Sequence, residues 1–173
     1  ITVAVVGAEI GTHASAATLN IAAVYTSSGT TLGSGSGSIG TIILASQNAS
    51  WKDEGNVNIG SGGGSGSVVQ SKGDVEISGK LSLGNSENSS GNYTLTGGTL
   101  KVTAIEIGGR GGTGAFNWTG GTMEANRVGG DLNNQGGTLI VSSETPMTIT
   151  GNYTQGSTGI LAITLKSTNQ GLV

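Results

Sequence analysis

The stretch "TGGTLKVTAIEIGGRGGTGAFNWTGGTMEANRVGG", Thr96 to Gly130, contains nearly the same phrase twice. "TGGTL" at Thr96–Leu100 returns as "TGGTM" at Thr119–Met123, and "IEIGG" at Ile105–Gly109 returns as "NRVGG" at Asn126–Gly130. Between the glycines, apolar and polar residues alternate, which is the two-residue period of a β-strand. A phrase of short strands and glycine turns that recurs at a fixed spacing is the sequence signature of a solenoid, in which each copy forms one coil.

The repeat extends toward the N-terminus when the chain is aligned on the strand that ends in glycine. The aligned segments are "NVNIG" (Asn56–Gly60), "KLSLG" (Lys80–Gly84), "AIEIG" (Ala104–Gly108) and "NRVGG" (Asn126–Gly130). In this alignment the last copy has lost two corner residues. We therefore predict an all-β fold, a parallel β-solenoid with coils of about 21–24 residues and three short strands in each coil.

Stacking of the coils predicts which side chains lie above one another. The predicted inward columns place Tyr93 and Leu95 over Phe116 and Trp118, Leu100 on Met123, and Ile59, Leu83, Ile107 and Val128 in one line. On the outside, Lys101 is expected beside Glu124, and Glu106 beside Arg127. Exposed ion pairs contribute about 0–1 kcal/mol each, so these pairs would help to set the register without driving folding.

The N-terminal part of the chain is less regular than the repeats. Residues 1–45 contain the apolar segments "ITVAVVG", "TLNIAAVY" and "TIILAS". We interpret them as N-terminal strands that form a cap or a subunit-contact segment, although Ala14–Val24 is also compatible with a helix. Residues 46–173 are assigned to the solenoid repeats.

Composition excludes several classes of function. The 173 residues include 34 Gly, one His and no Cys, and only 10% are charged, with a net charge of −3. Seven Lys and Arg residues scattered along the chain form no basic patch, which argues against a nucleic-acid partner. No apolar run approaches the ~20 residues of a membrane helix. With one His and no Cys, the chain lacks the residues for a zinc site or a Cys–His nucleophile, so we predict no metal and no cofactor.

Carboxylates are the remaining candidates for catalysis. Enzymes on parallel β-helices mostly act on polysaccharides and have carboxylates or basic residues clustered on one face. A glycosidase pair needs two carboxyl groups about 5–5.5 Å or about 6.5–9.5 Å apart. The predicted alignment stacks Ser82, and no second carboxyl group, on Glu106. We therefore predict solvated outer-face residues and no catalytic residue among Asp53, Glu54, Asp74, Glu76, Glu87, Glu106, Glu124, Asp131 and Glu144. Trp51 and Trp118 are expected in the core rather than as platforms for sugars.

Three segments carry a resemblance to a known family: "GNYTLTGGTLKV", "GTGAFNWTGGTM" and above all "TITGNYTQGSTGILAITL" (Thr148–Leu165). They resemble the glycine-rich β-strand repeats of bacterial autotransporter passengers and related large surface proteins, over roughly Asn56 to Leu165. The resemblance implies a right-handed parallel β-helix at the bacterial cell surface or outside the cell. There the solenoid would serve as a stalk or an adhesive surface, and no catalytic residue carries over.

The sequence thus favours a non-enzymatic structural protein of the bacterial surface or extracellular matrix, such as an adhesin stalk, a passenger or a filament segment. The alternative is a glycan-binding or glycan-cleaving β-helix. "ITVAVVG" at the N-terminus is uncharged, and "GILAITLKS" near the C-terminus has one Lys as its only charge, so neither end is expected to form a polar cap. The expected partners are therefore identical subunits stacked end to end or further repeats of a longer chain, with host or matrix glycans as a further candidate.

Overall fold

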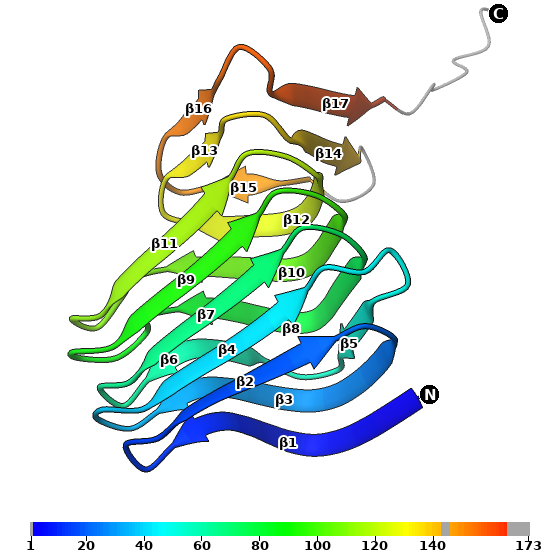
Figure 1. The fold of residues 1–173 in the computed structure, drawn as a ribbon. Coiled ribbons are helices and arrows are strands. Elements are labelled where there is room, and N and C mark those ends of the chain that lie inside the picture. Colours follow the sequence, from blue (N-terminus) through cyan, green and yellow to red (C-terminus); the bar gives the residue numbers. More distant parts are fainter. Residues whose placement is uncertain (1, 143–145, 166–173) are drawn as a thin grey trace, which may run out of the picture.

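The computed structural model describes residues 2–142 and 146–165, and this part of the chain forms a β-solenoid without a helix (Figure 1). The chain climbs from the coil of β1 and β2 to the coil of β14 to β16, followed by β17. The ten-stranded sheet comprises β1 (Thr2–Thr12), β3 (Val24–Ser34), β5 (Ser50–Asp53), β6 (Val57–Ser61), β8 (Asp74–Leu83), β10 (Thr99–Ile107), β12 (Thr122–Gly129), β14 (Thr138–Ser142), β15 (Thr148–Ile149) and β17 (Ile160–Thr164). The seven-stranded sheet comprises β2 (Ala16–Ile21), β4 (Ile39–Leu44), β7 (Ser65–Gln70), β9 (Ser90–Leu95), β11 (Thr113–Trp118), β13 (Leu132–Asn134) and β16 (Tyr153–Gln155). The strands of each sheet pair in parallel with the strands of neighbouring coils, as predicted.

The prediction of three separate strands in each coil is right for two coils and wrong for several others. β5 and β6 are separate, and both pair with the single strand β8. β14 and β15 are separate, and both pair with the single strand β12. In β8, β10 and β12, the two predicted strands merge into one longer strand. The pairing of β10 with β8 shifts register between Val102 and Ala104, so an irregularity replaces the predicted corner loop.

The register confirms most of the predicted stacking. Phe116 and Trp118 pair with Tyr93 and Leu95, and Met123 pairs with Leu100. In the third column, Ile59 pairs with Leu83, and Leu83 with Ile107. These contacts place the opening repeat in adjacent coils of the solenoid.

The predicted position of Val128 is wrong. It pairs with Ile105 rather than with Ile107, and Glu106 consequently lies opposite Gly129. The alignment matched glycines, but β10 and β12 keep one constant offset from the Thr99–Thr122 pair to the Glu106–Gly129 pair. The later repeat is shorter because the loop between β12 and β13 has fewer residues than the loop between β10 and β11.

Coil lengths vary more than the repeat in the sequence predicts. Val24 pairs with Ser50, and Thr30 pairs with Val57, so the chain runs further between these partners than in any aligned repeat. At the other extreme, Trp118 pairs with Asn134 after a much shorter step. The spacing of the repeat therefore holds in the middle coils and fails where corner loops gain or lose residues.

Glycines in the seven-stranded sheet let the two sheets approach closely. Gly40, Gly66, Gly91 and Gly114 form one column on adjacent strands. A Cβ atom at Gly91 would lie 2.1 Å from the carbonyl oxygen of Ile59, far inside van der Waals contact. Glycine is therefore required where these strands pack against the ten-stranded sheet.

The N-terminal segment continues the same architecture. Within residues 2–44, β1 and β3 belong to the ten-stranded sheet, and β2 and β4 to the seven-stranded sheet. The sheets run through the predicted boundary at residue 45 without a break, since β4 pairs with β7 and β3 with β5. The segment Ala14–Val24 contains strand β2 and no helix.

Candidate functional site

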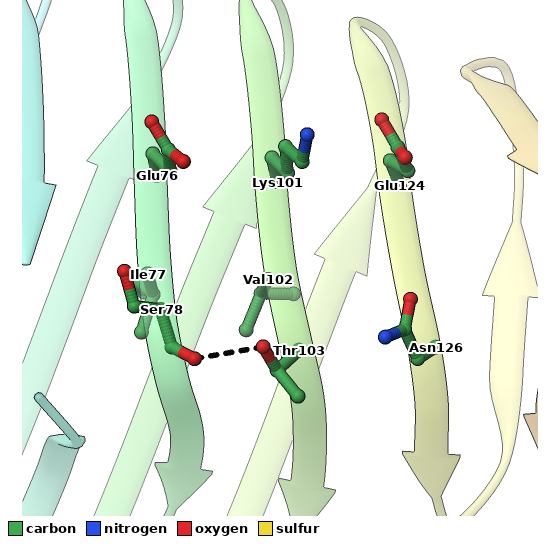
Figure 2. A pocket seen from close by; sticks show the side chains of 8 residues that line it. All are labelled: Glu76, Ile77, Ser78, Lys101, Val102, Thr103, Glu124 and Asn126. Carbon is green, nitrogen blue, oxygen red and sulfur yellow. Dashed lines mark hydrogen bonds between the residues drawn. The ribbon is translucent and has the colours of Figure 1, made fainter. Parts of the chain in front are cut away.

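A row of alternating charges crosses the outer face of the ten-stranded sheet. Lys52 pairs with Glu76, Glu76 with Lys101, and Lys101 with Glu124, each on the next coil. Figure 2 shows the last three at the same level on neighbouring strands, with Thr103 donating a hydrogen bond to the carbonyl oxygen of Ser78 below them (2.7 Å). Opposite charges on adjacent strands favour this register over shifted ones. The predicted pairing of Lys101 with Glu124 is confirmed.

This row offers little room for a ligand. The depression that it lines has a volume of about 100 Å³, whereas ligand pockets typically have about 300–1,000 Å³. Glu76 and Glu124 lie on either side of Lys101 in the register, so a whole strand separates the two carboxylates. The geometry therefore supports a role in coil register.

The second predicted outer pair also meets, although by a different route. Arg127 lies opposite Ala104 in the register, yet its guanidinium forms an ion pair with the carboxylate of Glu106. The long side chains span the diagonal between the two strands. Lys52 pairs with Glu54 on its own coil (3.3 Å). Both pairs are partly exposed, so each contributes at most about 1 kcal/mol.

Asp53 is the site residue that the sequence interpretation placed wrongly. It was expected on the solvated outer face, but it is fully buried. Its Oδ2 accepts hydrogen bonds from the hydroxyls of Ser27 (2.7 Å) and Thr30 (2.6 Å). Its Oδ1 accepts from the backbone N–H groups of Gly29 (2.9 Å) and Gly55 (2.8 Å). Four donors satisfy the carboxyl group, which is what burial of such a group requires.

The Asp53 cluster closes the corner between the strand pair β3–β5 and the strand pair β3–β6, where the offset between coils changes. Trp51 joins it by donating from Nε1 to the Ser27 hydroxyl (2.9 Å). Burial and, as the smaller effect, the charge of Asp53 raise the pKa of the nearby Tyr25. The sequence contained a usable signal: if Trp51 points inward, the two-residue period also turns Asp53 inward. The cluster is enclosed by the protein and stabilises a corner.

Two amides occupy the interior of the seven-stranded sheet. Gln70 accepts a hydrogen bond from the Tyr93 hydroxyl (2.6 Å) and donates to the carbonyl oxygens of Gly73 and Thr99. Asn134 plays the same part in a later coil, where it both donates to and accepts from the backbone of Gly137. Burial raises the pKa of Tyr93 strongly. These side-chain amides donate to backbone carbonyl oxygens at the turns, and they are buried.

Trp118 lies in the core, as predicted, with 1% of its surface exposed. It stacks on Leu95 below and on Asn134 above. Its ring meets Phe116 edge-on at a centroid distance of 6.3 Å. The indole Nε1 has no hydrogen-bond partner among the described residues. A Cβ atom at Gly137 would lie only 1.9 Å from that nitrogen, so the glycine makes room for the ring.

The outer face of the seven-stranded sheet differs sharply from the charged face. Its strands contain no Asp, Glu, Lys, Arg or His, whereas the strands of the ten-stranded sheet contain ten charged residues. Its outward rows are mainly hydroxyl and amide side chains, such as Thr18, Thr41, Ser67 and Asn92 on successive coils. The large apolar side chains of Ile39 and Val69 are exposed among them. The aromatic side chains of β9 and β11 point inward or lie half-buried. This face is therefore neutral, polar and without an exposed aromatic platform.

Two cavities larger than the depression on the charged face lie at the two ends of the solenoid. At the N-terminal end, a cavity of about 240 Å³ is lined by residues that include Val3, Leu19 and Tyr25. At the C-terminal end, a cavity of about 230 Å³ is lined by residues that include Tyr153 and Leu161. Both are mainly apolar, because they are the open ends of the hydrophobic interior. The sequence predicted that these ends would lack a polar cap.

Other candidates show no further convergence. His13 is exposed in a turn with positive φ (54°). Glu144 lies outside the described residues. Within residues 2–142 and 146–165, no three His, Cys, Asp or Glu side chains gather as ligands for a metal ion.

Comparisons with protein-family models, with curated proteins and with solved structures gave no match for the chain. None of the described residues belongs to a helix that is long and apolar enough to cross a membrane.

Proposed function

We propose that the chain is a non-enzymatic structural element of the bacterial cell surface or extracellular matrix, a rod segment that holds other parts at a distance. The observation that carries this proposal is the uninterrupted interior. One inward column runs through every coil, and its members are Val3, Tyr25, Trp51, Val75, Leu100, Met123, Leu139 and Leu161. The six inner members are at most 8% exposed. The eight strand levels give a stack of roughly 34 Å at the usual spacing of parallel strands.

The side faces support the same proposal. The cavity on the charged face is small, and the charges there alternate in a way that fixes register. Two larger cavities open at the ends, where a rod is extended. The resemblance of "GNYTQGSTGILAITL" to repeats of surface passengers supports the extracellular setting. The absence of Cys is compatible with that setting.

A glycan-binding role is the second candidate, and one observation favours it. The neutral face of the seven-stranded sheet presents exposed hydroxyl and amide groups at a regular spacing, and Asn117 donates a hydrogen bond to Asn92 on the neighbouring coil (2.7 Å). Such groups bind sugar hydroxyls. The lack of exposed aromatic rings on this face weighs against strong binding, since stacking on sugars needs them.

Two experiments on the purified chain separate these functions. A glycan array and an activity screen on polysaccharides should both be negative for a structural rod. Binding that is lost in Asn92→Ala, with Ser78→Ala on the opposite face as the control, would favour the glycan-binding role. Hydrolysis by the wild-type chain would overturn the structural proposal. Antibody labelling of intact producing cells tests the surface location.

A further inference from the structure

The two ends of the solenoid are nearly free of charge. Of the 17 Asp, Glu, Lys and Arg residues in the chain, fourteen lie between Lys52 and Asp131. Residues 2–44 contain only Glu9, and residues 146–165 contain none. Charged side chains are a usual means by which β-proteins prevent edge strands from pairing with other chains. The middle coils carry most of these charges, whereas the described end strands carry only Glu9 on β1.

The end strands also expose apolar side chains that continue the internal columns. Val3 is 47% exposed and Val5 38% exposed on β1. Leu161 is 42% exposed and Ile163 56% exposed on β17. Every other member of the column that starts at Val3 and ends at Leu161 is covered on both sides by a neighbouring coil. The two end residues lack this cover on one side, where the end cavities open.

Resting on the proposed structural function, we propose that the partner of each end is a second copy of this chain, joined head to tail. β17 of one copy pairs in parallel with β1 of the next. This register places Leu161 on Val3 and Ile163 on Val5, which extends the inward column across the joint (Figure 1 shows the two strands at opposite ends of the stack).

The geometry favours a second copy as the partner, because every boundary between coils within the chain is likewise a parallel pairing of strands. The outer edge of β17 presents the backbone groups that β14 presents to β17 within the chain. The outer edge of β1 presents the groups that β3 presents to β1. The two edges are therefore complementary to each other in the parallel sense that every coil boundary in the chain uses. A contact of this heterologous kind leaves a new free end after each addition, so it generates a filament instead of a closed dimer.

The joint is expected to be weaker than a boundary within the chain. When β17 lies on β1, one strand level separates β16, the last described strand of the seven-stranded sheet, from β2 of the next copy. Among the described strands, pairing at the joint therefore uses one sheet, whereas pairing inside the chain uses two. Assembly should consequently depend on concentration and reverse on dilution.

Two blocking variants test the proposal in solution. Leu161→Lys places an ammonium group at the C-terminal joint, and Val3→Lys places one at the N-terminal joint. Because both positions are partly exposed, each variant should fold, which circular dichroism checks. Sedimentation velocity of the wild-type chain should show assembly that grows with concentration, and each variant alone should sediment as a monomer. An equimolar mixture should form dimers, since β17 of the Val3→Lys copy and β1 of the Leu161→Lys copy are both intact.

A disulfide test fixes the register. The chain has no Cys, so Ala4→Cys combined with Ala162→Cys introduces two thiols that the proposed register brings opposite each other between copies. This double variant should form disulfide-linked ladders under oxidation. Ala4→Cys with Thr164→Cys, about 6.6 Å out of register along the strand, is the matched control and should link much less.

Several results would overturn the proposal. They are a wild-type chain that stays monomeric at all concentrations, assembly of either lysine variant alone, a mixture without dimers, or equal cross-linking of both cysteine pairs. A folded monomer would leave the proposed structural function standing, because that function fails on glycan hydrolysis or binding, which these assays do not measure.

Discussion

The two buried tryptophans allow a differential test of the core, because they differ in one hydrogen bond. Trp51 and Trp118 are 0% and 1% exposed, so replacing either by Phe removes the same volume from a closed interior. Trp51 donates from Nε1 to Ser27, whereas Nε1 of Trp118 has no partner among the described residues. Trp51→Phe therefore loses a hydrogen bond with a net value of about 0.5–1.5 kcal/mol. In the wild-type protein, burial of the unsatisfied Trp118 donor costs about 1–3 kcal/mol. Trp118→Phe removes this donor and therefore recovers that cost.

The cavity terms of the two substitutions should largely cancel, so the difference between them isolates the donor. We expect Trp51→Phe to destabilise the protein by about 2–4 kcal/mol more than Trp118→Phe. Urea denaturation followed by far-UV circular dichroism gives the free energy of unfolding of each variant. Trp118→Ala serves as the reference for full truncation and should cost about 3–5 kcal/mol.

Equal costs for the two Phe variants, or a larger cost at Trp118, would refute this reasoning. Such a result would mean that a partner satisfies the Trp118 donor or that the ring does not lie in the core. Because stacked coils can unfold in stages, the transitions should also be followed by the fluorescence of the one remaining tryptophan.

Four further outcomes are expected. Asp53→Ala leaves the Ser27 hydroxyl and two N–H groups without their acceptor and should cost about 3–5 kcal/mol in urea denaturation, with Asp53→Asn closer to wild type. Gly91→Ala forces a Cβ atom to within 2.1 Å of a backbone oxygen, so a soluble, normally stable variant would contradict the close approach of the sheets. A double-mutant cycle on Glu106 and Arg127 should give a coupling of about 0–1 kcal/mol that falls with salt. Since burial raises the pKa of Tyr93, the hydroxyl contributes stability that is present below pH ~10 and lost as the pH rises above it; Tyr93→Phe should reduce this alkaline loss in a pH series of melting temperatures.

The middle coils could be predicted from the sequence because local pattern and packing agree there. The alternation around Leu100 and Met123 identifies inward positions directly, and the intervening "TGG" turns fix the spacing between them. Where corner loops change length, the local pattern carries no information about register. Val128 was therefore assigned to Ile107, although the pairing of whole strands places it on Ile105.

Buried polar groups were the second failure, for a different physical reason. A charged residue is expected outside because burial of an unpaired charge is costly. Asp53 escapes this rule only because donors from two other positions in space, near Ser27 and Thr30, converge on it. That convergence depends on tertiary structure. That both ends lack a polar cap could be predicted from the sequence, since the scarcity of charges at both ends is a local property.

The central claim is the parallel stacking of coils, and one measurement tests it most directly. Nuclear Overhauser contacts in the labelled chain report which backbones are neighbours around Leu100. The solenoid predicts contacts from Leu100 to Val75 on one side and to Met123 on the other. Cross-strand contacts between Leu100 and Leu95 around the "TGG" turn, in place of these two, would show an antiparallel hairpin and contradict the account.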